Sequence, residues 1–406
     1  MKKSRTKSVP FKSFLNLFIA IFLFSGLLVW RFSTVEPTIK TGQAQFSGYL
    51  LQVPKVYDRW QYFDIDGYSI KTSSELKVEY GDKLEINGVV IDGRITSPEI
   101  KIIGASVWRQ KLFQLRQGLK AKIAAALPEP QSSLLAGIVL GSKEELPADF
   151  KDALIKTGTI HVVVVSGYNI SVIAGFLAGL ARIIKRQYSV FICIIGIAFY
   201  TFLVGAEPPA VRAAIMGSLA FLATFFGRQR FPLYSLLLTA YIMILVSPQV
   251  VKDIGFQLSF LATGGIILFQ NSLQKVFRSV PKPFGGDLST TLAAQILVIP
   301  AIFYHFGKVS AISPVANSLI LWIVPLATIL GFIFLVVSFS VSFIAPFLAL
   351  IIWVFLTVFV LVATAFSKIP FTNLNLTPGN LGPALLYYLV LGLIILYIKN
   401  VRMVKN

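Results

Sequence analysis

Side chains that could do chemistry stand close together in one run of this otherwise apolar chain. His161 precedes Ser166 in TGTIHVVVVSGYNIS (residues 157–171), and the chain has one further histidine, His305. A histidine that takes the proton of a serine hydroxyl would make a nucleophilic hydrolase. Ser166 lacks, however, the glycine two residues earlier that a G-x-S-G turn would show, and no acidic residue that could orient the base is evident. An intramembrane serine hydrolase with His161 or His305 as base is therefore a weaker alternative, and we expect no enzyme activity and no catalytic residue.

The same residues can instead line a polar pathway. Asn169 lies in a segment that continues as VIAGFLAGL (172–180). Polar side chains inside an apolar span must face protein or a water-filled cavity, because lipid offers them no hydrogen bonds. Three more polar clusters interrupt apolar segments, at residues 205–216, 253–265 and 294–320. Together the four clusters predict a hydrophilic pathway or an intramembrane active site.

The candidate lining residues share a polar side chain within an apolar segment, and they are His161, Ser166, Asn169, Arg212, Gln257, Ser259, Gln295, His305, Ser310 and Asn317. Beside them stand residues that break helices or permit close packing, as in the interrupted helices of transporters. These are Gly167, Pro208, Pro209, Gly255, Pro300, Gly307 and Pro314. Most members of the cluster at 253–265 are also explained by close helix packing and hydrogen bonds between helices, without any functional role.

Arg212 is the one basic residue that we place well inside the bundle. An arginine at the centre of a membrane helix costs about 2.5–3.5 kcal/mol on insertion scales. We expect it either to pair with Glu207 or Asp253 or to face an aqueous path for anions, and the sequence leaves both readings open.

Composition sets the fold class. Hydrophobic residues make up 55% of the 406 residues and charged residues only 14%, with a mean hydropathy of +0.75. A soluble domain has about a quarter charged residues, so we predict a polytopic α-helical membrane protein. The net charge of +19 is explained first by topology signals in loops. With two histidines and the single Cys193, a histidine-rich or cysteine-based metal site is excluded, and we expect no metal and no cofactor. No G-x-x-x-x-G-K-[ST] motif occurs, so no P-loop motor is encoded.

About ten spans are expected to position the clusters. Residues 1–32 predict an uncleaved signal anchor behind a basic N-terminus, a cleaved signal peptide being the alternative. The other spans are expected at 160–181, 188–205, 209–226, 232–247, 254–270, 288–305, 313–338, 341–366 and 382–398. Basic residues gather in alternate loops, which predicts cytoplasmic N- and C-termini.

Two segments differ from the spans. Residues 40–104 alternate polar and apolar residues in short runs, which predicts four to six strands of a small extracytoplasmic β-barrel domain, OB-like around YGDKLEINGVV (80–90). Such a domain binds single-stranded nucleic acid or serves as a spacer, and both readings stay open. Residues 105–158 predict a basic amphipathic helix over 106–126 and two short interfacial helices over 132–140 and 147–156, the second ended by Gly158. The transmembrane bundle is expected over 159–400.

Four motifs resemble the competence (ComEC-type) membrane channel family: GSKEELPADFKDALIKTGTIHVVVVSGYNIS, GAEPPAVRAAIM, GFQLSFLATGG and YHFGKVSAISPVANSLI. They cover roughly 131–330, in the family's order and at its spacings. The resemblance implies a channel that carries single-stranded DNA across the bacterial cytoplasmic membrane in natural transformation. It also implies that several of the polar residues above occupy positions of the family's motif residues, namely His161, Ser166, Arg212, Gln257, Ser259, His305, Ser310 and Asn317.

The chain departs from the family in two ways. Where the family usually has Ser-Gly-Leu-His, this chain has Ser166, Gly167, Tyr168 and Asn169, and the amide does not titrate near neutral pH. We further expect a short form without the metallo-β-lactamase-like domain that larger members carry, so strand degradation would need a separate nuclease.

The expected partners are single-stranded DNA, membrane lipids and a cytoplasmic ATPase or a strand-binding protein that gives direction to transport. An oligomer is one arrangement that the sequence permits. A transporter of another anion, such as a nucleotide or a lipid-linked polymer, is the main alternative.

Overall fold

The computed structural model describes residues 25–34, 41–51, 54–57, 59–65, 67–96, 98–142, 146–163, 166–180, 185–281, 284–341, 343–369, 373–375, 379 and 382–393. The chain divides into two compact units, Met1–Gly118 and Leu119–Asn406. Within the first unit, residues 25–33 are helical. The rest of the expected anchor over 1–32 lies outside the described residues.

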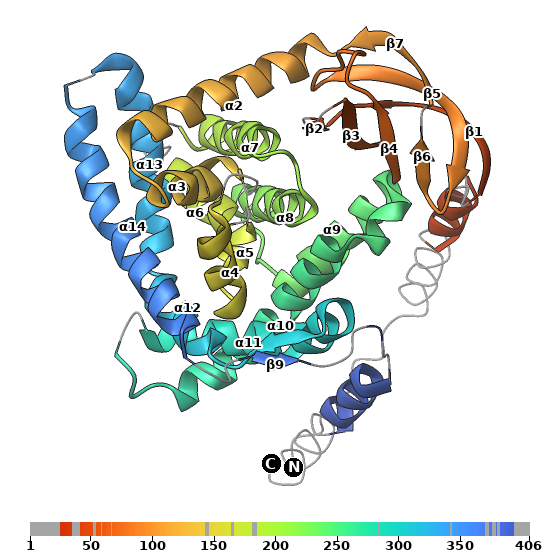
Figure 1. Cartoon of the computed structure of the whole chain (residues 1–406). Helices are drawn as coiled ribbons and strands as arrows, with labels where there is room; N and C mark the ends of the chain where they lie inside the picture. The colour runs from red at the N-terminus through yellow and green to blue at the C-terminus, as the bar shows by residue number, and fades with distance from the viewer. Residues whose placement is uncertain are drawn as a thin grey trace. The chain divides into compact units, whose positions relative to one another are not determined.

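The first unit contains a curled, mostly antiparallel sheet (Figure 1). Its strand order is β1-β5-β6-β4-β3-β2, β7 also pairs with β5, and β4 and β6 run parallel. The strands are β1 (Thr41–Tyr49), β2 (Lys55–Tyr57), β3 (Trp60–Ile65), β4 (Tyr68–Ser73), β5 (Asp82–Ile91), β6 (Arg94–Thr96) and β7 (Glu99–Ala105). Seven strands form where four to six were expected, and among the described residues no pairing joins β1 to β2. A closed OB-like barrel is therefore not confirmed.

Alternating burial holds this sheet together. In β3 the side chains of Gln61, Phe63 and Ile65 are buried while Trp60 and Tyr62 are exposed, as the period of two predicts. The core continues through Leu50, Ile70, Leu84, Ile86 and Ile95, which are all at most 1% exposed.

The helix α2 (Val107–Ala126) begins in the first unit and ends in the second. It contains no acidic residue, and its buried residues are Leu119 and Ile123. The expected basic amphipathic helix over 106–126 is thus present with nearly the expected bounds.

The second unit is mostly helical, and most of its helices begin and end within a few residues of the expected bounds. Its elements are α3 (Gln131–Leu140), α4 (Ala148–Lys156), α5 (Ile160–Val163), α6 (Gly167–Leu180), α7 (Arg186–Leu203), α8 (Pro208–Phe225), α9 (Pro232–Val246), η2 (Pro248–Lys252), α10 (Ile254–Val276), α11 (Phe284–Phe306), α12 (Ser313–Ile320), α13 (Ile323–Ser340), α14 (Ala345–Ser367) and the short strands β8 (Lys308–Ser310) and β9 (Asn373–Asn375). Residues Gly382–Leu393 form a further helix.

Five of the described helices are long and apolar enough to cross a membrane, namely α8, α10, α11, α13 and α14. Five more apolar helices have only 10–17 residues, among them Gln131–Leu140 and Gly167–Gly179. Because a span needs about 20 residues, ten spans are not confirmed. All ten residues of α3 are buried, and the helix packs on α13 and α14.

Two expected spans are interrupted. The span expected at 160–181 divides into α5 and α6, and the span at 313–338 divides into α12 and α13. Pro325 explains the second break, because proline has no N–H to donate to the carbonyl of Leu321. That carbonyl instead accepts from Val324 N at 3.2 Å, in a tighter turn.

Pro300 lies inside α11 and frees the carbonyl of Ile296 in the same way, yet α11 continues to Phe306. Two tyrosines of the helix Gly382–Leu393 cover this part of α11. The hydroxyl of Tyr387 donates to Ile296 O at 3.1 Å, and that of Tyr388 donates to Leu297 O at 2.7 Å. The terminal helix therefore supplies the hydrogen bond that the proline removes.

Replacing Tyr387 by phenylalanine should destabilise the second unit, because the freed carbonyl loses its donor. Hydrogen bonds between membrane helices contribute about 0.6–1.7 kcal/mol. Cys193 is the only cysteine and is 1% exposed, so its reaction with a thiol-reactive dye on heating reports unfolding of the purified protein.

The midpoint temperature should fall for Tyr387→Phe and Tyr388→Phe, and it should stay unchanged for Tyr188→Phe, which alters an exposed side chain of α7. Equal midpoints for all three variants would contradict a stabilising role of the terminal helix.

Candidate functional site

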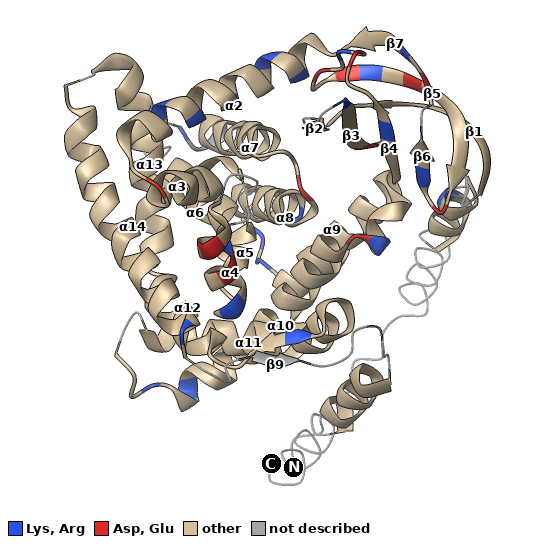
Figure 2. Ribbon diagram, in the orientation of Figure 1, with Lys and Arg blue, Asp and Glu red and all other residues tan. Residues whose placement is uncertain are grey.

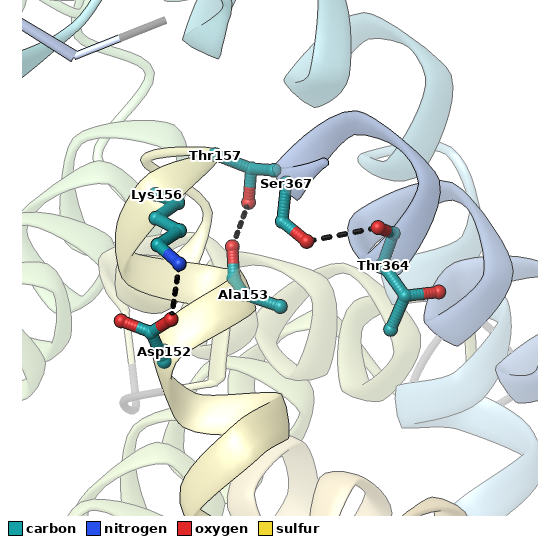
Figure 3. A network of polar contacts seen from close by, with 6 residues as sticks. All are labelled: Asp152, Ala153, Lys156, Thr157, Thr364 and Ser367. Carbon is teal, nitrogen blue, oxygen red and sulfur yellow. Dashed lines mark hydrogen bonds and ion pairs between the residues drawn. The ribbon is translucent and has the colours of Figure 1, made fainter. Parts of the chain in front are cut away.

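The run of residues 157–163 is held by backbone capping at the end of α4. Gly158 adopts φ +67°, and the amides of Gly158 and Thr159 donate to Ile155 O and Leu154 O, as in a Schellman motif. The hydroxyl of Thr157 donates to Ala153 O at 2.8 Å. Lys156 pairs with Asp152 at 2.7 Å on the same helix, and the end of α14 lies nearby (Figure 3). The expected helix end at Gly158 is confirmed.

His161 bonds within this same turn. Its Nδ1 lies 3.0 Å from the carbonyl oxygen of Gly158, and the residue is exposed. No hydrogen bond joins it to Ser166 among the described residues. The nearest partner of His161 is therefore backbone, not the serine that a hydrolase would need.

A polar cluster joins α4, α11, β8 and α12 near Ser313, and in it the side chains of Ser313 and Asn317 are buried. Gln295 Nε2 and Asn317 Nδ2 each donate to Ser313 Oγ at 3.0 Å, and Ser310 Oγ donates to Lys156 O at 2.7 Å. A Cβ on Gly158 would lie 2.8 Å from Ser313, so only glycine fits there. The three predicted residues Gln295, Ser310 and Asn317 thus lie in one region. The sequence did not predict Ser313, the common partner of Gln295 and Asn317, although the adjacent Pro314 at the start of α12 could have indicated it.

Asn169 ties α6 to the end of α3. Its Nδ2 donates to Ile138 O at 3.0 Å, and the side chain is fully buried. Ile138 belongs to the last four residues of α3, whose carbonyls have no partner within the helix. The amide therefore holds two helices together. In the described part of the chain, its Oδ1 and that of Asn317 are buried without a hydrogen-bond partner.

Arg212 lies where α8 crosses the start of α6. Its Nη1 is 3.5 Å from Ser259 O on α10, a weak contact, and its Nη2 would lie 1.9 Å from a Cβ on Gly167, the first residue of α6. Its Nε is buried and has no hydrogen-bond partner among the described residues. The guanidinium therefore packs against backbone at the amino end of a helix.

Pairing of Arg212 with Asp253, one of the readings that the sequence leaves open, is not observed among the described residues. Asp253 instead caps α10, where its Oδ1 accepts from Phe256 N at 2.7 Å. An aspartate at this position satisfies an amide that the first turn of a helix leaves unpaired.

Gln257 and His305 connect α10 and α11. Gln257 Nε2 donates to Val251 O at 2.9 Å, so its Oε1 faces His305 Nε2 at 2.8 Å. Since Oε1 can only accept, this geometry assigns the proton to Nε2 of His305. In the neutral ring, Nδ1 of His305 therefore carries no proton.

The predicted helix-breaking residues mark element ends or close contacts. Pro208 and Pro209 begin α8, and Gly255 approaches Pro209, where a Cβ would lie 3.5 Å from its Cδ. Gly307 ends α11 with φ +64°, and Pro314 lies in the first turn of α12. Each therefore helps to place a polar cluster.

Comparison with known proteins agrees with the motifs. The family model described as Competence protein matches residues 138–401. ComE operon protein 3 of Bacillus subtilis is 26% identical over 215 residues, which cover 52% of this chain and 27% of that protein. An uncharacterised protein of Aquifex aeolicus is 32% identical over 38% of this chain and 35% of its own length. The protein YcaI of Escherichia coli is 26% identical over 52% of this chain and 30% of its own.

The matched segments thus span only about a third of the length of these relatives. No solved structure matches the chain. Because the family model covers more than half of the sequence, including every polar contact described above, the chain belongs to the competence protein family.

Proposed function

We propose that this chain is a membrane conduit for single-stranded DNA in natural transformation. Support comes from the family, from the five long apolar helices and from the polar contacts gathered within residues 138–401. In this proposal the chain lies in the bacterial cytoplasmic membrane with both termini in the cytoplasm, and its β-rich first unit lies outside.

The proposal rests mainly on the position of the Arg212 guanidinium beside the first residue of α6. A helix amino end carries partial positive charge and free N–H groups, so it attracts anions. The guanidinium adds a full charge at the start of α6 and has an unpartnered buried Nε among the described residues. We infer that a phosphate of the passing strand binds there. The neighbouring amides and hydroxyls would offer weaker, sequence-independent contacts.

Transport would take its direction from a cytoplasmic ATPase or from proteins that bind the strand as it emerges. Degradation of the other strand is assigned to a separate nuclease. In this proposal the chain itself binds and guides DNA and carries out no bond cleavage.

Two other functions compete. A carrier of a nucleotide or a lipid-linked polymer would also use Arg212, because these substrates carry phosphate too. A serine hydrolase is less well supported, because His161 and His305 bond to Gly158 O and Gln257 and not to Ser166.

Uptake of labelled DNA in competent cells tests the role of Arg212. Deletion of the gene should abolish uptake. Arg212→Ala should reduce it about tenfold or more, because a hydrogen bond to a charged group contributes about 1.5–3 kcal/mol. Arg212→Lys should retain part of the uptake, since it keeps the charge without the planar fork of donors.

The exposed Arg228, just beyond α8, provides a control, and Arg228→Ala should leave uptake unchanged. Undiminished uptake in both Arg212 variants would refute the phosphate role. Binding of single-stranded DNA to the purified protein separates the alternatives, because efficient competition by nucleotide or by lipid phosphate would favour the other anions.

Gly167→Ala tests the position of the guanidinium without changing its charge. A methyl group there would occupy the place of Nη2, so the flexible arginine end must move away from α6. We expect reduced uptake at normal protein abundance. Gly175→Ala, in the same helix with no atom within 4 Å of the added Cβ, should transport normally. Equal uptake in the two variants would show that the close approach of Arg212 to α6 is dispensable.

A further inference from the structure

A hollow outside the polar clusters lies between the end of α2, the end of α13 and the start of α14. Its volume is about 700 Å³, and its lining includes Lys122, Ala126, Phe334, Ala349 and Trp353. None of its lining residues is acidic, and Lys122 is the only charged one. The hollow is therefore an apolar pocket with a single positive charge.

The charge lies at one end of the pocket. Lys122 Nζ donates to Ser338 O at 3.1 Å and lies 4.4 Å from the ring centroid of Phe339. Ser338 is in the last turn of α13, and Phe334 lies one turn deeper along the same helix. On α14 the lining extends from Ala345 to Trp353, about 12 Å along the axis. The pocket thus leads from a cation at the helix ends to apolar side chains farther along the helices.

The place of the pocket in the membrane follows from its helices. Both α13 and α14 are candidate spans that contain no charged residue, and α14 is tan along its length in Figure 2. The short connection between them must therefore lie near a membrane surface. Lys122 is then at headgroup level, and the side chains of Phe334 and Trp353 lie at the depth of the acyl chains.

We propose that this pocket binds an anionic phospholipid, with its phosphate at Lys122 and one acyl chain along Phe334, Ala349 and Trp353. The ammonium group has three donors, and Ser338 O takes one of them. A free phosphate would gain nothing from the apolar walls, whereas a phospholipid satisfies both ends of the pocket. Such a lipid would fix the end of α2 on the α13–α14 hairpin. The proposal is independent of what the chain transports.

Native mass spectrometry of the full-length protein tests this assignment. The protein is delipidated and offered palmitoyl-oleoyl phosphatidylglycerol or the phosphatidylcholine with the same chains. We expect selective retention of phosphatidylglycerol. Lys122→Gln should lower its retention about fivefold, as a basic residue near an anionic headgroup predicts. Lys275→Gln, at an exposed lysine in the last turn of α10, should have no effect.

A second pair of variants tests the apolar part. Ala126 is exposed and lines the pocket, so Ala126→Phe should fill it without disturbing a core and lower retention of both lipids. Ala124→Phe, at an exposed position outside the lining, should retain lipid as the unaltered protein does. Equal retention of the two lipids by the unaltered protein would overturn the proposal. Equal phosphatidylglycerol retention by the variants at Lys122 and Lys275, or by those at Ala126 and Ala124, would overturn it as well.

Discussion

Polar groups in an apolar bundle need partners, and this requirement governs the second unit. Where proline removes a backbone donor, another donor or a tighter turn takes its place, as at Ile296 O and Leu321 O. Where a helix ends inside the unit, a side chain reaches its last carbonyls, as Asn169 does at α3. Unsatisfied polar groups cost several kcal/mol in lipid, so these contacts keep short and interrupted helices stable.

Some buried polar atoms are exceptions to this pattern, because they have no hydrogen-bond partner among the described residues. Among the described residues of the second unit, the buried side-chain atoms without a hydrogen-bond partner are Gln131 Oε1, Asn169 Oδ1, the Tyr200 hydroxyl, Arg212 Nε, Asp287 Oδ2 and Asn317 Oδ1. Those of Asn169, Arg212 and Asn317 belong to the polar clusters recognised from the sequence. A bundle that satisfies most of its polar groups and leaves a guanidinium incompletely bonded is suited to an anionic ligand that supplies the missing acceptors. The pocket at Lys122 has a different character, because one charge there meets an apolar wall, which suits an amphiphile instead.

Local patterns predicted much of the fold. Apolar periodicity placed most helices within a few residues, and the helix end at Gly158 followed from glycine's freedom at positive φ. Pro325 is a local signal for the break between α12 and α13. Because it lies in a continuous apolar run, a single span was expected there. The expected number of spans and the closed barrel are not confirmed. Both depend on contacts between residues far apart in the sequence, which no local pattern encodes.

The polar residues within apolar segments could be recognised from the sequence, but the contacts that they make could not. Gln257 and His305 were both recognised as polar residues in apolar segments, yet they are 48 residues apart and their bond requires α10 and α11 to pack together. Asp253 was one of two residues considered as partners of Arg212, but it caps α10. Neither Ser313 nor Tyr387 was predicted as a contact residue, because a serine before a proline and a tyrosine in an apolar helix are common.

The most direct measurement of the central claim is site-specific photo-crosslinking during uptake. Tyr168 directly follows Gly167 and is replaced by benzoylphenylalanine, with the exposed Phe199 of α7 replaced in the same way as a control. If DNA passes the guanidinium of Arg212, labelled single-stranded DNA will crosslink at position 168 in competent cells and not at position 199. Efficient uptake without crosslinking at 168, or equal crosslinking at both positions, would contradict a path along the start of α6.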